Sequence, residues 1–317
     1  MRRRWRSTID ASAAPKTDPF VRHETSPLRD SGHAVERRFD VPGLTLAARE
    51  WGEPGGLPVI ALHVWLDNAG TFDLLAPLLD GTHLIALDCA GHGRSGHRSP
   101  DATYNVWQDV PDVFAVADLM GWDRFALLGH SRGAAIASLA AGTLPERVVS
   151  LMLIDGGIPI PGEPDEAPQR FAKSLISRDR LRTDRGRIFA SREEAIRERS
   201  QGFTETTYAA AEILARRSLH PADDGHSWFV DQRLKTESEL RLTTDQIAAF
   251  MRAVRSPTLA VLASRSPLTT QSGFVELLQQ IPDIELSRIE GGHHFHLEDA
   301  AEEIANLVQT FLASCRV

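Results

Sequence analysis

Short, nearly continuous apolar runs alternate with amphipathic stretches along most of the chain. An apolar run of four to seven residues is typical of a strand that is buried on both faces, as in a parallel sheet. Strands that alternate with helices predict an α/β fold, in which a mostly parallel central sheet has helices on both faces. The expected strands occupy residues 59–62, 84–87, 125–128, 148–154, 259–262 and 284–289.

Other patterns predict the elements around these strands. Residues 35–41 and 44–51 flank Pro42-Gly43 and predict a β-hairpin. Apolar residues at helical spacing predict helices over 72–79, 106–117, 247–254, 274–278 and 304–312, the second of them bent by Pro111. Ser191-Arg-Glu-Glu194 and Thr243-Thr-Asp-Gln246 have the pattern of capping boxes, which begin helices.

The alternation stops between residues 156 and 241, where four prolines are followed by charged helical segments without a convincing strand run. Because this insertion follows a strand of the sheet, we expect it to form a helical cap above the strand ends. The alternative is an ordinary surface excursion. The expected organisation is a flexible extension over residues 1–33, a core over 34–155 and 242–317, and a cap over 156–241.

Composition narrows the classes of partner. The 317 residues carry a net charge of −8, which argues against a nucleic-acid partner or an anionic membrane, although Arg2, Arg3, Arg4 and Arg6 make the N-terminus locally basic. No apolar run approaches the length of a membrane span, and the first residues lack the apolar segment of a secretory signal. Two distant cysteines provide no disulfide framework. We therefore expect a cytoplasmic protein.

Candidate chemistry is concentrated in Gly129-His-Ser131-Arg-Gly133, which joins the strand at 125–128 to a run of small residues. A G-x-S-x-G turn between a strand and a helix exposes the serine hydroxyl and needs small residues where the backbones cross. The helix N-terminus that follows favours developing negative charge. Ser131 is therefore the candidate nucleophile; the alternative is a tight structural turn with a buried serine.

A serine nucleophile needs a base that accepts its proton, and a histidine after the last strand can reach the turn. Gly292-His293 follows the strand at 284–289, and we expect His293 to be this base. His294 and His296 are competing candidates. A zinc site made of the three histidines is disfavoured, because neighbouring loop side chains diverge and no acidic or cysteine ligand spacing accompanies them.

Together these residues resemble the α/β-hydrolase superfamily from about residue 34 to the C-terminus. The resemblance rests on Gly129 to Gly133, on the segments 88–96 and 63–69, and on Gly292-His293. The segment His63-Val-Trp-Leu-Asp-Asn-Ala69 is similar to the serine hydrolase-like group. The resemblance implies an oxyanion hole made by the backbone N–H groups of Trp65 and Arg132. The family usually has glycine where this chain has Val64, and His63 is expected to hold the loop rather than to react.

The third member of the expected triad departs from the family's pattern. In most relatives an aspartate follows the strand after the cap, where this chain has Ser266. A carboxylate is needed because it orients the histidine and stabilises the imidazolium. Asp155, at the end of the strand over 148–154, is the best replacement. The alternative is that Asp155 only caps the first turn of the cap.

The expected function is that of a serine hydrolase without a cofactor, most simply a carboxylesterase acting on a small-molecule ester of small or medium acyl length. Carbon–carbon, thioester and lactone hydrolysis use the same residues, because the cap and pocket choose the reaction. Val64 and Ser266 also fit a degenerate protein that only binds a small molecule. The expected pocket lining includes His63, Trp65, Phe72 and Trp228, with neighbouring Phe229. The oligomeric state stays open.

Overall fold

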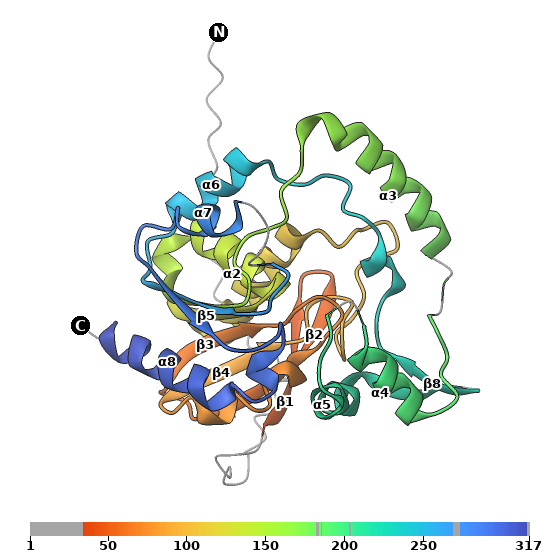
Figure 1. Cartoon of the computed structure of the whole chain (residues 1–317), viewed down its shortest axis with the longest axis horizontal. Helices are drawn as coiled ribbons and strands as arrows, with labels where there is room; N and C mark the ends of the chain where they lie inside the picture. The colour runs from red at the N-terminus through yellow and green to blue at the C-terminus, as the bar shows by residue number, and fades with distance from the viewer. Residues whose placement is uncertain are drawn as a thin grey trace, which may run out of the picture. The chain divides into compact units, whose positions relative to one another are not determined.

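An eight-stranded sheet forms the centre of the chain (Figure 1), in the strand order β1-β2-β4-β3-β5-β6-β9-β10. The computed structural model describes residues 34–181, 184, 186–202, 204–222, 224–268 and 273–315, and the extension expected over residues 1–33 lies outside them. β2 pairs antiparallel with both β1 and β4, and every other pairing in this sheet is parallel. The mostly parallel sheet expected from the apolar runs is thus confirmed.

The strands follow the predicted runs closely. Their bounds are β1 Val35–Val41, β2 Leu44–Gly52, β3 Leu57–Leu62, β4 Thr82–Leu87, β5 Phe125–His130, β6 Val148–Ile154, β9 Thr258–Ala263 and β10 Ile284–Ile289. All residues of β4, β5 and β9 are buried, because helices cover both faces of the sheet.

Two hydrophobic clusters separate the sheet from its helical layers. One cluster contains residues of α1 (Val110–Leu119), α2 (Arg132–Thr143), α6 (Thr244–Ala253) and α7 (Phe274–Leu278). The other contains residues of α8 (Ala301–Ser314) and of two 3₁₀ turns, η1 (Ala69–Phe72) and η2 (Ala76–Leu78). Further 3₁₀ turns are η3 (Val106–Asp109), η4 (Pro145–Arg147) and η7 (Phe295–Leu297). The sheet is therefore the middle of three layers.

Two helix predictions are wrong in detail because of proline. The helix expected over 72–79 is replaced by η1 and η2, because Pro77 cannot donate a helical hydrogen bond and its ring obstructs the preceding turn. Pro111 does not bend a helix; it lies in the first turn of α1, where its missing N–H removes no hydrogen bond.

The insertion between β6 and α6 contains α3 (Ala167–Leu181), α4 (Arg192–Ser200) and α5 (Tyr208–Ser218), with η5 (Pro164–Glu166) and η6 (Gln232–Lys235). It also contains a two-stranded hairpin, β7 (Leu219–Ala222) and β8 (Gly225–Trp228), which the sequence did not predict. Strands of four residues that include Pro221 are too short and too irregular to show a period of two.

The two capping predictions have different outcomes. Thr243 and Gln246 form the complete capping box at the start of α6. At α4, the Ser191 hydroxyl accepts from the Glu194 N–H, but the Glu194 carboxylate accepts from the Ala190 N–H, 2.9 Å away, so the reciprocal bond lies one residue earlier. Among the described residues, no helix has both the length and the apolar character needed to cross a bilayer.

Candidate active site

Ser131 lies on a strained turn between β5 and α2. Its φ of 54° falls in the left-handed region, which non-glycine residues rarely occupy and which is common at functional sites. The two glycines of the motif are required by close backbone approach. A Cβ on Gly133 would lie 2.0 Å from the Leu62 carbonyl oxygen, and one on Gly129 would lie 2.4 Å from the Cα of Ala134. The turn therefore has the geometry expected of a nucleophile elbow.

His293 connects Ser131 to a buried carboxylate. Its Nε2 is 2.9 Å from the Ser131 Oγ, and its Nδ1 is 2.5 Å from the Asp155 Oδ2. Because a carboxylate only accepts hydrogen bonds, the proton of the neutral imidazole lies on Nδ1, which leaves Nε2 free to accept from the serine hydroxyl. The three side chains form one continuous hydrogen-bonded chain, with His293 buried and Ser131 partly exposed.

Asp155 follows directly after β6, the strand next to the strand that carries Ser131. It has a φ of 39° and no exposed surface, and its second oxygen accepts from the Ala263 N–H at 3.0 Å. A Cβ on Gly156 would lie 2.6 Å from the Cα of Ser131, so this backbone packs directly against the serine. The carboxylate is thus held between β9 and His293, which a residue that merely capped the insertion would not need.

Ser266, at the position where the family usually has its acid, is buried after β9. Its hydroxyl accepts from the Leu268 N–H at 3.1 Å and so takes part in the local turn. The carboxylate that is missing from this loop is present one strand away, at Asp155.

The two N–H groups expected to form the oxyanion hole have no partner among the described residues. Neither the Trp65 nor the Arg132 backbone N–H donates to another of the residues that the structure describes. The Arg132 side chain turns away to Asp109, with Nη2 2.6 Å from Oδ2. The only left-handed residue in the Trp65 loop is Leu66, so the backbone at Val64 does not require glycine.

His63 has the structural role expected for it. The Cys89 N–H donates to its Nε2 at 2.9 Å, and its Nδ1 donates to the Val64 carbonyl oxygen at 2.6 Å. Burial lowers the pKa of His63, which keeps the ring neutral and able to accept. The ring ties β3 to the loop after β4.

The competing histidines have other partners. His296 Nε2 is 3.0 Å from the Thr71 hydroxyl, and His294 Nε2 is 3.2 Å from Asp67 Oδ2. His130 donates from Nε2 to the His293 carbonyl oxygen at 2.8 Å, which supports the loop that carries His293. Burial holds the pKa values of His130 and His296 well below the usual value. Only His293 reaches Ser131 in this geometry.

Two arginines of the insertion bind carboxylates of the core. Arg199 of α4 contacts Asp67, with Nη2 2.5 Å from Oδ1, and its Nη2 is 3.1 Å from His294 Nε2. Burial by itself would raise the pKa of Asp67, but the Arg199 charge and the bond to His294 outweigh burial and lower it. Asp67 therefore stays ionised and links α4 to the histidine loop.

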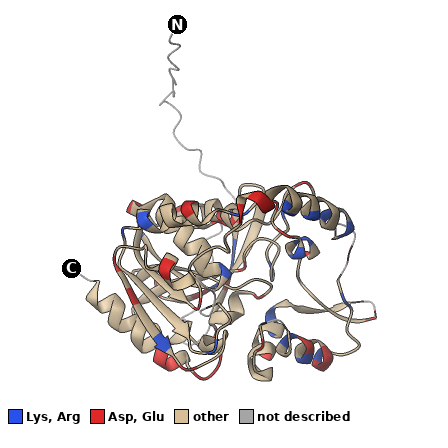
Figure 2. Ribbon diagram, turned by 45° about the horizontal axis from the view of Figure 1, so that its top comes forward, with Lys and Arg blue, Asp and Glu red and all other residues tan. Residues whose placement is uncertain are grey.

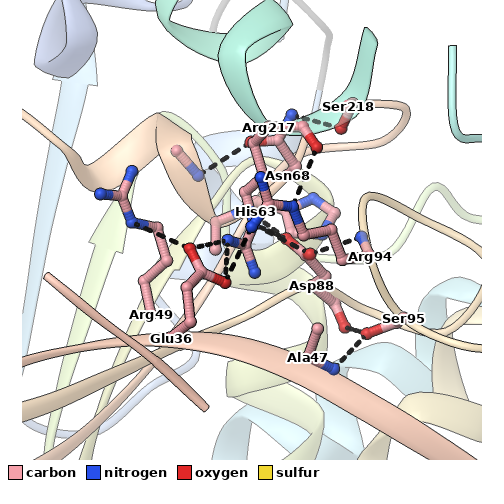
Figure 3. A network of polar contacts seen from close by, with 12 residues as sticks. Glu36, Ala47, Arg49, His63, Asn68, Asp88, Arg94, Ser95, Arg217 and Ser218 are labelled. Carbon is pink, nitrogen blue, oxygen red and sulfur yellow. Dashed lines mark hydrogen bonds and ion pairs between the residues drawn. The ribbon is translucent and has the colours of Figure 1, made fainter. Parts of the chain in front are cut away.

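The second arginine is Arg217 of α5, which Figure 3 shows reaching Asp88 and Glu36. Its Nε is 2.9 Å from both Asp88 oxygens, and its Nη1 is 2.6 Å from a Glu36 oxygen. Asp88 also accepts from the Ala69 and Arg94 backbone N–H groups at 2.7 Å. The carboxylate thus joins the cap to two loops of the core.

The predicted pocket residues do not gather in one place. Phe72 has no exposed surface and packs in the core cluster with α8, so that prediction is corrected: the ring fills the core beside His296. Trp228 packs with Ile196 and Ala215 inside the cap. Trp65 is 40% exposed, and its Nε1 donates to the Leu234 carbonyl oxygen of η6 at 3.0 Å.

Phe229 is also partly exposed and stacks on His220, with ring centroids 3.8 Å apart. Of the predicted lining, Trp65 joins the loop after β3 to η6 of the insertion. Within the described parts of the chain, no three His, Cys, Asp or Glu side chains are arranged to hold a metal ion.

Sequence reasoning missed the charged contacts of Arg199 and Arg217. Both arginines lie in helices rich in charge, where most such side chains are solvated, so no local signal distinguished them. The acceptors were more visible: Asp67 and Asp88 each follow a buried strand, where polar side chains of an α/β sheet converge.

Comparisons with known proteins show the family of the chain. The family model for the alpha/beta hydrolase fold matches residues 57–300. A "serine hydrolase-like protein" of Danio rerio is 29% identical over 88% of this chain and 88% of its own length. A 2-(acetamidomethylene)succinate hydrolase of Mesorhizobium japonicum is 25% identical over 89% of this chain and 96% of its own length. A crystal structure of a hypothetical protein of Pseudomonas aeruginosa PAO1 has a TM-score of 0.84 and 45% identity, covering 88% of this chain and 99% of that one.

Proposed function

The chain belongs to the α/β-hydrolase family and is a hydrolase, and on that premise we propose that it is a serine hydrolase acting as a carboxylesterase on small-molecule esters. The observation that supports this proposal is the unbroken chain of hydrogen bonds from Ser131 through His293 to Asp155. The same three residue types, at these distances, perform acyl transfer on unrelated folds.

In the proposed mechanism, Ser131 Oγ attacks the ester carbonyl carbon while His293 Nε2 takes the hydroxyl proton. Asp155 keeps the His293 proton on Nδ1 and stabilises the imidazolium that forms. The Trp65 and Arg132 N–H groups donate to the oxyanion of the tetrahedral intermediate. His293 then protonates the leaving alcohol, and the acyl group remains on Ser131.

Deacylation repeats these steps with water as the nucleophile. His293 removes a proton from water, the hydroxide attacks the acyl-enzyme, and the proton returns to Ser131 as the carboxylic acid leaves. The proposed residues need no cofactor for either half of the cycle.

Labelling with a fluorophosphonate probe tests the nucleophile without knowledge of the substrate. We expect wild type to be labelled and Ser131→Ala to be unlabelled, with both folded by circular dichroism. Absence of labelling in folded wild type would contradict a working serine and favour a protein that only binds its ligand.

Ester specificity needs a separate experiment. Wild type and Ser131→Ala are compared on p-nitrophenyl esters of increasing acyl length, on thioesters and on lactones. We expect the esters to be hydrolysed with the highest kcat/KM. Faster turnover of another class would reassign the substrate while retaining the nucleophile; the relative named for hydrolysis of 2-(acetamidomethylene)succinate justifies including that compound.

A further inference from the structure

Helix α3 is oriented with its polar side towards the protein. Residues spaced by one helical repeat, Arg170, Ser174, Ser177 and Arg178, are buried or partly buried, whereas Phe171 is exposed. The Arg170 guanidinium is bound by Glu166, with Nη2 2.7 Å from Oε2, and η6 contacts the helix. A surface helix of a globular protein normally shows the reverse pattern, with its apolar stripe facing the core.

The large apolar residues of α3 are exposed. Phe171, Leu175 and Ile176 are 45%, 42% and 75% exposed, and Ala172 between them is exposed too. Phe171 and Leu175 are four positions apart and so are neighbours on the helix surface, and Ala172 and Ile176 form a second such pair beside them. We call Phe171, Leu175 and Ile176 the α3 patch. Three large apolar side chains together on one helix face are typical of an interaction surface.

Basic side chains lie along one border of the α3 patch. Lys173 and Arg180 are exposed and are three and four positions from Ile176, so the three side chains line up along the helix. No ion pair between side chains that the structure describes involves either cation. Figure 2 shows Lys and Arg recurring along this helix. The helix therefore combines exposed apolar residues with exposed basic ones.

We propose that α3 binds an anionic lipid surface, lying in the plane of the interface with the α3 patch in the acyl region and Lys173 and Arg180 on the headgroups. A helix with one apolar face and a basic border has the composition of interfacial membrane helices. We choose a lipid surface because the exposed cations Lys173 and Arg180 lie beside the α3 patch, where anionic headgroups would meet them. A second copy of the chain is the competing occupant, and the test below distinguishes the two.

The net charge of −8 makes the chain as a whole unfavourable for binding to an anionic membrane. Charge more than about 8 Å from the surface is screened at physiological ionic strength, so the charge on α3 itself decides the contact. The proposal concerns the outer side of the cap and does not depend on the chemistry at Ser131.

Sedimentation of the full-length protein with lipid vesicles tests the proposal. Vesicles of phosphatidylcholine alone are compared with vesicles that also contain phosphatidylglycerol, at low and physiological salt. We expect wild type to bind the anionic vesicles more strongly, and the binding to weaken as salt rises. Neutralising both cations, in Lys173→Gln/Arg180→Gln, should weaken binding to anionic vesicles by about 25-fold, since each basic side chain contributes about fivefold.

The apolar contribution has its own variant and a matched control. Phe171→Ser/Ile176→Ser should weaken binding to anionic vesicles by about tenfold or more, because both side chains lose their burial in the acyl region. Leu119→Ser, which changes an exposed leucine at the end of α1, should leave binding unchanged. All variants alter exposed side chains, and equal thermal midpoints confirm that each is folded.

Three results would overturn the proposal. The first is no association of wild type with either vesicle. The second is binding that survives both α3 double variants, which would assign it to another segment, such as the arginines of residues 2–6. The third is a dimer, detected by light scattering without lipid, that Phe171→Ser/Ile176→Ser converts to monomer, since the α3 patch would then be covered by a second copy of the chain.

Discussion

At the scale of single residues, the candidate site depends on two residues with strained backbones, each directly after one of two adjacent strands. Ser131 and Asp155 both have positive φ, although neither is glycine, and each follows the last residue of its strand. Such conformations persist only where the surroundings enforce them. Here the Asp155-Gly156 backbone packs against Ser131, so the two strained turns hold one another in position.

The first prediction concerns the acid. Asp155→Asn should reduce turnover by on the order of 10⁴. The asparagine amide would donate to His293 Nδ1, so the imidazole proton would lie on Nε2. A protonated Nε2 cannot accept the hydroxyl proton of Ser131. Steady-state kinetics with the best ester measure the loss, and Ser266→Ala should stay near the wild-type rate. A loss below about tenfold for Asp155→Asn would remove Asp155 from the proposed triad.

The second prediction concerns the elbow. Gly133→Ala should destabilise the fold by about 3 kcal/mol or more, because the new Cβ would lie 2.0 Å from a backbone oxygen of β3 that cannot move alone. Gly292→Ala is the control: a Cβ there meets no atom within 4 Å, and the backbone is not left-handed. Urea unfolding measures both variants, and equal stability of the two would mean that the elbow tolerates a side chain.

At the scale of elements, the insertion between β6 and α6 is attached to the rest of the chain through buried charges. α4 supplies Arg199 to Asp67, and α5 supplies Arg217 to Asp88 and Glu36 (Figure 3). Asp67 follows the oxyanion loop and contacts His294 next to His293, so α4 reaches both parts of the candidate site. The insertion is thereby joined to the site as well as to the fold.

The third prediction concerns this attachment. Arg217→Ala should destabilise the protein by about 3 kcal/mol, because it leaves the Asp88 carboxylate buried without its counter-charge. Arg216→Ala, one residue earlier on α5, removes an equal charge from a side chain that is 66% exposed. We expect that control to change the unfolding free energy by less than about 0.5 kcal/mol. Similar losses in both variants would show that Arg217 acts only as a surface charge.

At the scale of the whole molecule, buried histidines connect stability to pH. Burial lowers the pKa values of His63 and His92, and those of His130 and His296 in the same way. In the unfolded chain these rings titrate near pH 6.5, so below that pH the unfolded state binds more protons than the folded state. Stability is therefore complete above pH 6.5 and falls as the pH decreases.

The fourth prediction is the size of this effect. Each histidine that stays neutral in the folded state lowers the free energy of unfolding by up to about 1.4 kcal/mol for each pH unit below 6.5. The four together lower it by up to about 5 kcal/mol per pH unit. Asp112 opposes them: burial raises its pKa to about 6, and the stability it contributes is lost as the pH rises through that value. Urea unfolding from pH 7.5 to 5.5 measures the sum. Constant stability over that range would contradict the neutral, buried state of these rings.

Local sequence was sufficient for the strands, and it identified the two side chains that we propose as nucleophile and base. Continuous apolar runs such as residues 125–128 and 148–154 are unfavourable in contact with water on either face, so they predict strands that are buried on both faces of the sheet. The glycines around Ser131 and the histidine after the last strand are also local, because close backbone approach and chain order restrict the residues that fit. Pro77 and Pro111 show where the same reasoning failed. The effect of a proline depends on its position in the helical turn, and the spacing of apolar residues does not reveal that position.

Only the tertiary structure decided which residues share a site. In sequence, Asp155 could equally be the replacement acid or a cap for the insertion, and the order of strands β5, β6 and β9 brings it to His293. Phe72 was expected in the pocket because it is aromatic, yet packing buries it completely. Phe171 is of a residue type usually found in the core, yet it is exposed on α3. The physical reason is the same in each case: burial and charge pairing depend on contacts between residues far apart in the chain, and these exist only once the sheet and its cap have assembled.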